Sequence, residues 1–290
     1  MNILGLFNGM STGHTALNNV GIKVDKYYSS EIKPAAIKLT QHHYPDTIQL
    51  GDVTKWKQWD INWKSIDMVL SGSPCQDLSI AGKRKGLEGE RSSLFWVFVD
   101  ILNHIKELNP DVLFLQENVG SSPRGDIGIM SRALGVYPVR INSSLVTAQL
   151  RDRYYWSNIK TTQDGLFGDI KTDIPQPTDK KIMFKDIVTG GYVIKNKSNC
   201  ILMGECRPNN NKEGRYYRYI NKCFSNIVFN QPKENLSPFD NRYLNQIELE
   251  RLQGFKDNWT SMLSRNDAAS LLGDGWTLPI IEHIFSFIKR

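Results

Sequence analysis

The amino-terminal segment places the strongest constraint on the fold of this 290-residue chain. The apolar run 2–7 is followed by the glycine-containing turn Asn8–Gly13 and then by helical periodicity through Ala16, Leu17 and Val20. A strand, a glycine-rich turn and a helix form the unit with which Rossmann-like folds hold a nucleotide-like cofactor, because glycine admits close approach of the backbone. The turn has neither the G-x-G-x-x-G spacing nor a following Lys-Ser/Thr pair, which disfavours a dinucleotide or a triphosphate.

Two further predicted strands each run into a carboxylate. Residues 24–29 lead to Glu31, and residues 47–50 lead to Asp52. Taken alone, each carboxylate is more often a solvated loop residue. Because the carboxyl ends of parallel strands meet at one edge of a sheet, the two together favour an adenosine-containing cofactor without phosphates.

A cysteine occupies a tight turn after a fourth predicted strand. The apolar run 66–70 leads into Gly72-Ser73-Pro74-Cys75. A thiol at the carboxyl end of a buried strand is placed as α/β enzymes place reactive groups. The alternative interpretation is a small buried thiol, which is the commoner fate of a lone cysteine.

Five short motifs occur along the chain in a characteristic order: Phe7–Gly13, Pro74–Gln76, Glu117–Val119, Gln149–Trp156 and Glu248–Phe255. On these motifs the chain resembles the S-adenosyl-L-methionine-dependent DNA cytosine-5 methyltransferases over nearly its whole length. Their common order makes the resemblance specific, although each motif alone is short.

Two departures from the usual family pattern indicate a branch. Met10-Ser11-Thr12-Gly13 replaces the usual glycine-rich ending of the cofactor loop, and Gly273-Asp274-Gly275-Trp276 replaces a Gly-Asn-Ser/Ala segment. Both look more like the animal de novo DNA methyltransferases, a branch also seen among bacterial and phage enzymes. The cofactor motif begins near residue 2, and the cysteines are interpreted as reduced thiols, so we expect a minimal, stand-alone, cytoplasmic enzyme of bacterial or phage type.

The resemblance implies catalytic roles for Cys75, Glu117, Arg151 and Arg153. The Cys75 thiolate would attack carbon 6 of cytosine, Glu117 would protonate or hydrogen-bond ring nitrogen 3, and Arg153 would hold the exocyclic oxygen. Because the reacting atom is buried in a duplex, the base must be flipped out of the helix. No side chain is assigned to removal of the carbon-5 proton, and water is the expected base.

The resemblance also implies two sets of binding residues. The expected cofactor contacts are Phe7, Asn8, Gly9, Met10, Ser11, Thr12, Glu31, Ile32, Asp52, Val53, Gly72, Pro74, Leu94, Asp274, Gly275 and Trp276. The expected DNA contacts are Gln76, Ser79, Lys83, Arg84, Lys85, Arg215 and Arg218. The glycine-rich, basic segment 81–91 is interpreted as a lid that closes over DNA, or else as a solvated loop.

The basic charge is concentrated late in the chain. The net charge is +6, and the window 190–235 contains eight Lys or Arg residues against three Glu. Arginine reads base edges and lysine contacts phosphates, so this window is predicted to recognise the DNA target through Arg215 and Arg218, with an exposed loop insertion as the alternative.

The predicted fold is α/β: a Rossmann-like, mixed, mostly parallel sheet with helices on both faces, plus a small target-recognition module. We expect a catalytic domain over 1–175, a recognition region over 176–240, and C-terminal helices over 241–290 that complete the catalytic domain. The four cysteines lack C-x-x-C spacing, so no metal site is predicted. The expected partners are double-stranded DNA and a possible cognate restriction endonuclease. The rival functions are tRNA cytosine-5 methylation and catalytically silent DNA binding.

Overall fold

The computed structural model describes residues 1–73, 93–163, 165–166, 168–202, 205, 210–222, 226–232 and 237–289. These residues form two compact units. The first unit comprises Met1–Ile141, Asp152–Gln176 and Ile281–Arg290, and the second comprises Asn142–Arg151 and Pro177–Ile280. No helix in the described part of the chain is long and apolar enough to cross a membrane.

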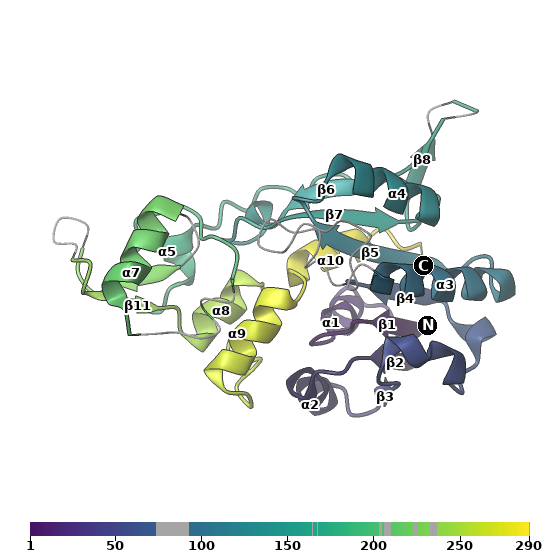
Figure 1. Ribbon diagram of the computed structural model, residues 1–290, viewed down its shortest axis with the longest axis horizontal. Helices are drawn as coiled ribbons and strands as arrows, with labels where there is room; N and C mark the ends of the chain where they lie inside the picture. The colour runs from purple at the N-terminus through teal and green to yellow at the C-terminus, as the bar shows by residue number, and fades with distance from the viewer. Residues whose placement is uncertain are drawn as a thin grey trace. The chain divides into compact units, whose positions relative to one another are not determined.

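The first unit is built on a seven-stranded sheet in the order β3-β2-β1-β4-β5-β7-β6 (Figure 1). β1 pairs in parallel with β2 and β4, β2 with β3, and β4 with β5, whereas β7 runs antiparallel to β5. The strands are β1 (Asn2–Leu6), β2 (Lys26–Ser30), β3 (Ile48–Gln49), β4 (Met68–Ser71), β5 (Leu113–Val119), β6 (Val139–Asn142) and β7 (Asp152–Ser157). The predicted mixed, mostly parallel sheet is confirmed. β8 (Thr161–Gln163) and β9 (Ile170–Thr172) form a separate antiparallel hairpin.

Both faces of the central strands are buried. Leu4 pairs in register with Tyr28 and Val69, and these three side chains belong to one apolar core. On the opposite face, Ile3 and Met68 are also fully buried. Because side chains alternate along a strand, burial of both sets requires cover on both faces of the sheet, as in a doubly wound α/β fold.

The helices of the first unit begin and end at residues that suit those positions. They are α1 (Thr12–Asn19), α2 (Pro34–His43), the 3-10 helices η1 (Val53–Gln58) and η2 (Trp63–Ser65), α3 (Ser93–Leu108) and α4 (Arg124–Leu134). Pro34 starts α2, where its missing N–H has no intrahelical partner to lose. Gly135 ends α4 in the left-handed conformation with a φ of 74°.

The second unit is made of short elements. They are η4 (Ser143–Leu145), α5 (Phe184–Ile187), α7 (Lys212–Tyr217), the π-helical turn η5 (Arg218–Lys222), β10 (Ile227–Phe229), β11 (Asn241–Tyr243), α8 (Gln246–Leu252) and α9 (Arg265–Asp274). α10 (Leu278–Phe285) begins in this unit and ends in the first. A small core of Tyr219, Ile227 and Phe229 packs between η5 and the antiparallel pair β10–β11.

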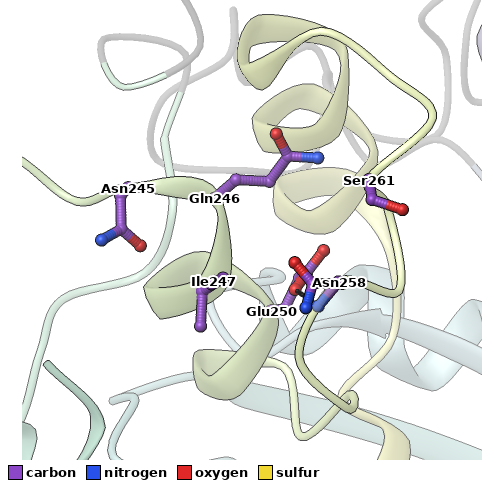
Figure 2. A pocket seen from close by; sticks show the side chains of 6 residues that line it. All are labelled: Asn245, Gln246, Ile247, Glu250, Asn258 and Ser261. Atoms are coloured by element: carbon purple, nitrogen blue, oxygen red, sulfur yellow. Dashed lines mark hydrogen bonds between the residues drawn. The ribbon is translucent and has the colours of Figure 1, made fainter. Parts of the chain in front are cut away.

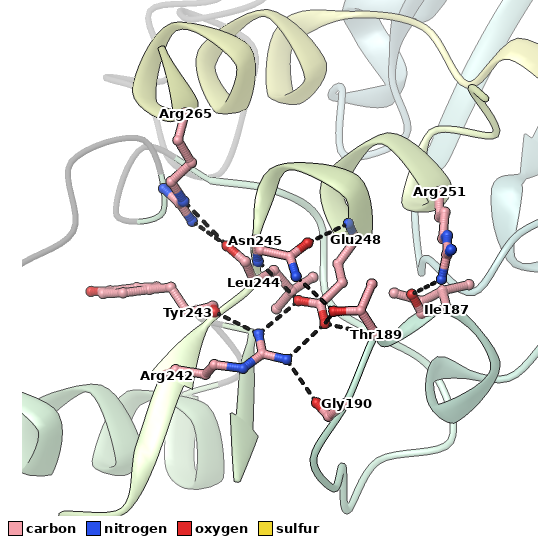
Figure 3. A network of polar contacts seen from close by, with 10 residues as sticks. All are labelled: Ile187, Thr189, Gly190, Arg242, Tyr243, Leu244, Asn245, Glu248, Arg251 and Arg265. Atoms are coloured by element: carbon pink, nitrogen blue, oxygen red, sulfur yellow. Dashed lines mark hydrogen bonds and ion pairs between the residues drawn. The ribbon is translucent and has the colours of Figure 1, made fainter. Parts of the chain in front are cut away.

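The unit boundaries differ from the predicted domains after residue 240. The first boundary, between Gln176 and Pro177, is close to the predicted one, but α8 and α9 group with the second unit and not with the sheet. The reason is visible in Figure 3: Arg242 on β11 donates to both carboxylate oxygens of Glu248 on α8, each at 2.8 Å, and Arg265 on α9 donates to the carbonyl of Leu244 at 2.8 Å. Of the predicted completing segment, Ile281–Arg290 alone groups with the first unit.

Candidate functional site

The loop after β1 has an unusual backbone. Phe7, Gly9 and Ser11 all have positive φ, at 53°, 55° and 57°. Phe7 and Ser11 carry side chains, and a left-handed backbone is unfavourable for such residues. Backbone strain of this kind is typical of functional sites. Ser11 precedes α1, and its side chain makes no capping hydrogen bond. The first-turn N–H groups of α1 are therefore not capped by Ser11, as in helix termini that bind anionic groups.

Glu31 joins this loop to the end of β2. Its Oε2 accepts a hydrogen bond from the Gly9 N–H at 2.7 Å, and its Oε1 accepts from the N–H groups of Ile32 at 2.8 Å and Lys33 at 2.9 Å. A carboxylate has about four acceptor positions, so these three bonds leave it able to accept from a ligand hydroxyl. Ile32, the next predicted contact, is 70% exposed, which is a high value for a large apolar side chain.

Asp52 lies at the end of β3 and caps η1. Its Oδ1 accepts from the Thr54 N–H at 2.9 Å and the Thr54 hydroxyl at 2.8 Å, and these bonds lower the pKa of the carboxyl. The Ser30 hydroxyl donates to the Gly51 carbonyl at 2.7 Å, which ties the ends of β2 and β3 together. The ends of the first three strands in the chain thus lie at one edge of the sheet, as predicted from the parallel order. Val53 is buried, and Leu94 packs against the main core.

The two central polar motifs meet on neighbouring strands. Glu117 Oε1 on β5 pairs with Arg153 Nε on β7 at 2.7 Å, and both side chains are largely buried. In the antiparallel register Arg153 lies opposite Val119, so Glu117 and Arg153 are diagonal neighbours on one face of the sheet. Arg153 also donates to the carbonyl of Asp152 at 2.8 Å, which restricts its guanidinium further. An acid and a guanidinium are therefore held together at a fixed position.

Gln116 anchors the segment that follows β4. Its side chain is fully buried, and its Nε2 donates to the Ser73 hydroxyl at 2.9 Å and to the Glu117 carbonyl at 2.7 Å. Ser73, which directly precedes Pro74 in the sequence, is thereby tied to the residue next to Glu117. Gln116 is not among the predicted site residues, although a polar amide inside an otherwise apolar strand distinguishes it in the sequence. The residues that follow, Pro74, Cys75, Gln76, Ser79, Lys83, Arg84 and Lys85, lie outside the described residues.

Arg151 does not fit the catalytic role predicted for it. It is buried at 3% exposure in the second unit, where its Nη1 donates to the Gly273 carbonyl at 3.0 Å and its Nη2 to the Gly275 carbonyl at 2.8 Å. A guanidinium that holds two backbone carbonyls positions the loop that contains them. Arg151 is therefore a positioning residue for the segment that includes Asp274 and Trp276.

The same loop is held a second time by Gln253. Its Nε2 donates to the Leu272 carbonyl, and its Oε1 accepts from the Thr277 hydroxyl at 2.9 Å. The next residue, Gly254, has a φ of 78°, and a Cβ built there would lie 2.3 Å from the ring of Pro279. This close approach requires glycine. The predicted contacts Asp274, Gly275 and Trp276 belong to this held loop of the second unit, whereas those at residues 7–12 belong to the first.

Arg215 also differs from its predicted role. It is buried at 4% exposure, donates to Asn241 Oδ1 at 2.7 Å and to the Asn241 carbonyl at 3.1 Å, and stacks over the Tyr243 ring at 4.1 Å. This burial contradicts a base-edge contact. Arg218 is half-buried and keeps its prediction. A guanidinium can be buried where it both hydrogen-bonds to an amide or carbonyl and stacks on an aromatic ring. The amino-acid composition of the window does not show that such partners are close in space.

Two more basic side chains of the window 190–235 bind the protein itself. The Lys197 ammonium donates to the carbonyls of Ser144, Thr147 and Ile182, at 2.6, 3.0 and 2.6 Å. Lys195 donates to the Tyr219 carbonyl at 2.7 Å. Part of the charge that predicted a DNA-binding window therefore stabilises the fold of the second unit.

A cavity of about 440 Å³ in the second unit contains none of the predicted site residues. Figure 2 shows its lining: Asn245, Gln246, Ile247, Glu250, Asn258 and Ser261. Glu250 is fully buried but accepts from the N–H groups of Asn258 and Thr260, each at 2.7 Å, so both of its carboxyl oxygens already have hydrogen-bond partners. Within the described ranges no cluster of His, Cys, Asp and Glu could hold a metal ion.

Comparisons with known proteins agree with these observations. Residues 1–122 match the family model for the C-5 cytosine-specific DNA methylases. The chain is 38% identical over 120 residues to the type II methyltransferase M.NgoBV of Neisseria gonorrhoeae, covering 40% of this chain and 27% of that protein. It is 31% identical over 172 residues to the orphan methyltransferase M.SPRI of Bacillus phage SPR, covering 55% and 38%. The chain thus spans well under half the length of these two relatives.

One further relative and the solved structures extend over more of the chain. Type II methyltransferase M1.ScrFI of Lactococcus lactis is 27% identical and covers 90% of this chain and 71% of that protein. The crystal structure of the S. pombe Dnmt2 methyltransferase has a TM-score of 0.67 at 16% identity, covering 99% of this chain and 98% of that one. The Entamoeba histolytica methyltransferase EhMeth has a TM-score of 0.69 at 15% identity, covering 100% and 99%. At these identities the structures show the fold alone.

Proposed function

We propose that the chain transfers a methyl group from S-adenosyl-L-methionine to carbon 5 of cytosine in double-stranded DNA, because its residues 1–122 match the family model for the C-5 cytosine-specific DNA methylases. The observation that carries the proposal is the Glu117–Arg153 pair, held at 2.7 Å, together with the bond by which the neighbouring Gln116 holds Ser73, two residues before Cys75 in the sequence. A catalytically silent DNA-binding protein would have no need for a buried acid and guanidinium fixed at that place.

Each polar group has a task in the proposed reaction. The Cys75 thiolate forms a bond to carbon 6 of cytosine, and the electron pair displaced from the ring makes carbon 5 nucleophilic. Glu117 protonates or hydrogen-bonds ring nitrogen 3, which makes carbon 6 more electrophilic. Arg153 stabilises the charge that develops on the ring and its exocyclic oxygen. After methylation, water removes the carbon-5 proton, the carbon–sulfur bond breaks, and any proton donated to ring nitrogen 3 returns to Glu117, which regenerates the thiolate, the acid and the aromatic ring.

The edge of the sheet fits an adenosine cofactor with a carboxylate tail. Uncapped first-turn N–H groups of α1 suit the carboxylate, Glu31 suits the ribose hydroxyls, and the exposed Ile32 suits the adenine ring. When bound, S-adenosyl-L-methionine supplies an electrophilic methyl group on a sulfonium. The chain's own contribution is to hold the loop at Phe7–Thr12 in one conformation before the cofactor arrives.

Cytosine in a duplex must leave the helix to reach such a site. We assign recognition of the DNA target to the second unit, with Arg218 as a contact residue and Arg215 as its internal support. Lys83, Arg84 and Lys85 remain predicted phosphate contacts, and Gln76 and Ser79 predicted contacts near the flipped base.

The test compares two cysteine variants on duplex DNA and on tRNA. Wild type and Cys200→Ser should methylate cytosine in duplex DNA, as read by bisulfite sequencing, and Cys75→Ser should not, because a serine hydroxyl is far less ionised than a thiol. Cys200 is the matched control, since its thiol merely donates to the Leu150 carbonyl at 3.0 Å. Methylation of tRNA in place of duplex DNA, or an active Cys75→Ser, would overturn the proposal.

A further inference from the structure

A stack of three rings lies behind the loop that follows β1. The imidazole of His14 on α1 lies between Tyr27 on β2 and Tyr44 at the end of α2, with centroid distances of 4.5 and 3.9 Å and interplanar angles of 5° and 18°. Each tyrosine hydroxyl donates a hydrogen bond beyond the stack. The Tyr44 hydroxyl donates to Thr15 Oγ1 on α1 at 2.9 Å, whereas the Tyr27 hydroxyl donates to Asn8 Oδ1 in the loop itself at 2.8 Å.

The bond to Asn8 continues through the loop. Asn8 Nδ2 donates to the Ser11 hydroxyl at 2.6 Å, and that hydroxyl is 2.9 Å from Thr40 Oγ1 on α2. Asn8 lies between Phe7 and Gly9, and Ser11 is the third residue with positive φ. This chain of side chains therefore crosses the whole left-handed stretch and fixes it from both ends.

The strand below the loop leaves room for this contact at one glycine. A Cβ built on Gly5 would lie 2.6 Å from Asn8 Oδ1 and 2.8 Å from the Tyr27 hydroxyl. Both distances are too short for a real contact, so a side chain at position 5 would displace the hydrogen-bonded pair. The sequence Gly5-Leu6-Phe7-Asn8 thus supplies both the acceptor and the space that the Tyr27 hydroxyl needs.

The stack is uncharged under ordinary conditions. Burial raises the pKa of Tyr27 well above its usual value, so its hydroxyl keeps the proton that it donates to Asn8. Burial lowers the pKa of His14 to about 4, so the imidazole between the two tyrosines is neutral near pH 7. The ring stack is therefore a fixed support and not a titrating switch.

We propose that Tyr27 is a positioning residue for S-adenosyl-L-methionine, which acts through Asn8 to hold the loop Phe7–Ser11 in its left-handed, cofactor-binding conformation. The inference rests on the proposed function, since it concerns the same cofactor site. Tyr27 itself is 3% exposed and lies behind the loop, so it acts through Asn8 and not by touching the ligand. Because the loop is already ordered in the free protein, less conformational entropy is lost on binding, and the cofactor affinity is higher.

The test compares Tyr27→Phe with the matched control Tyr44→Phe. Both variants keep a ring against His14 and lose one hydroxyl, but Tyr27→Phe alone leaves Asn8 without its donor. Calorimetric titration with S-adenosyl-L-methionine should give a dissociation constant raised by about 5- to 30-fold for Tyr27→Phe, the scale of a lost hydrogen bond to a partly buried acceptor. The cofactor KM should rise with it while kcat at saturating cofactor is kept. Tyr44→Phe should bind the cofactor as the wild type does.

A double-mutant cycle identifies the route. If Tyr27 acts through Asn8, Tyr27→Phe should add no further loss of affinity to Asn8→Ala. Gly5→Ala, which removes neither group but displaces both, should weaken the cofactor in the same direction. Equal effects of the two tyrosine variants, or a full additive loss in the Asn8→Ala background, would overturn the inference. Failure of the wild type to bind the cofactor at all would instead overturn the proposed function.

Discussion

Replacement of Glu205 by glutamine should stabilise the protein near neutral pH. Burial raises the pKa of Glu205 to about 8 from 4.5, although hydrogen bonds from the N–H and Nδ2 of Asn226 to Oε1 and the charge of Arg265 act in the opposite direction. Between these two pH values the folded protein holds a proton that the unfolded chain has released. The free energy of unfolding therefore falls as the pH rises, by about 1.4 kcal/mol per pH unit across this window.

The expected gain follows from the same numbers. Between pH 5 and pH 7 the cost of keeping that proton grows by about 3 kcal/mol, and an amide, which does not ionise, avoids it. The amide oxygen of Glu205→Gln can keep both bonds from Asn226, and an amide nitrogen at the Oε2 position adds a penalty that is independent of pH. The slope of the difference with pH thus reports the carboxyl alone.

The assay is urea unfolding of wild type and Glu205→Gln at intervals from pH 5 to pH 8. The variant should gain on the wild type by about 3 kcal/mol between pH 5 and 7, and the gain should level off above pH 8. Burial lowers the pKa of His14 to about 4, so protonation of His14 lowers the free energy of unfolding as the pH falls. Both proteins contain His14, so its contribution cancels in the difference between them. A difference that does not change with pH would refute the reasoning.

Three further substitutions test the site and its support. Glu117→Gln should lower the single-turnover methylation rate by about 10²–10⁴-fold and spare cofactor affinity, because the amide cannot donate a proton to cytosine; a loss of a few-fold would move the acid elsewhere. Arg151→Lys should lower the free energy of unfolding by about 2–4 kcal/mol in urea, since it deprives two carbonyls of bidentate donors; an unchanged stability would return Arg151 to a direct role. Burial alone would raise the pKa of Glu248, but hydrogen bonds from Arg242 and from two N–H groups outweigh it and lower that pKa below 4.5. Its stabilisation is present above pH 4.5 and is lost as the pH falls, so Glu248→Gln should be less stable than wild type at pH 7 and converge with it in acid.

The sequence was sufficient for the parallel strands β1 to β4 and for the loop after β1. Apolar runs that end in glycine or a carboxylate predicted β1 to β4 and their common edge, because parallel strands buried on both faces have a recognisable composition. Glu117 and Arg153 were predicted to act in the same reaction, but their direct contact was not predicted. Their contact depends on the register of β5 against β7, which a one-residue shift would break, and no local pattern encodes that register.

The errors have a common physical cause. Arg151 and Arg215 were assigned to the reaction and to DNA because arginine binds anions, yet both are buried against backbone carbonyls or an amide of their own unit. A guanidinium has five donors and suits either task, and only the surrounding acceptors decide between them. The predicted assignment of residues 241–290 to the first unit was wrong for most of the segment. The ion pair of Arg242 with Glu248 holds α8 to β11, and no pattern in the sequence predicts that pairing.

The residues of a short motif can therefore present a functional group or support the backbone of a loop, and this chain contains both kinds of residue. Glu117 and Arg153 present functional groups at the edge of the sheet, whereas Arg151, Gln253 and Gly254 hold the loop at residues 272–279 by hydrogen bonds and close packing. Loss of activity after substitution is expected at both kinds of position. Removal of Arg151 or Gln253 should in addition destabilise the fold, because backbone carbonyls of that loop lose their donors.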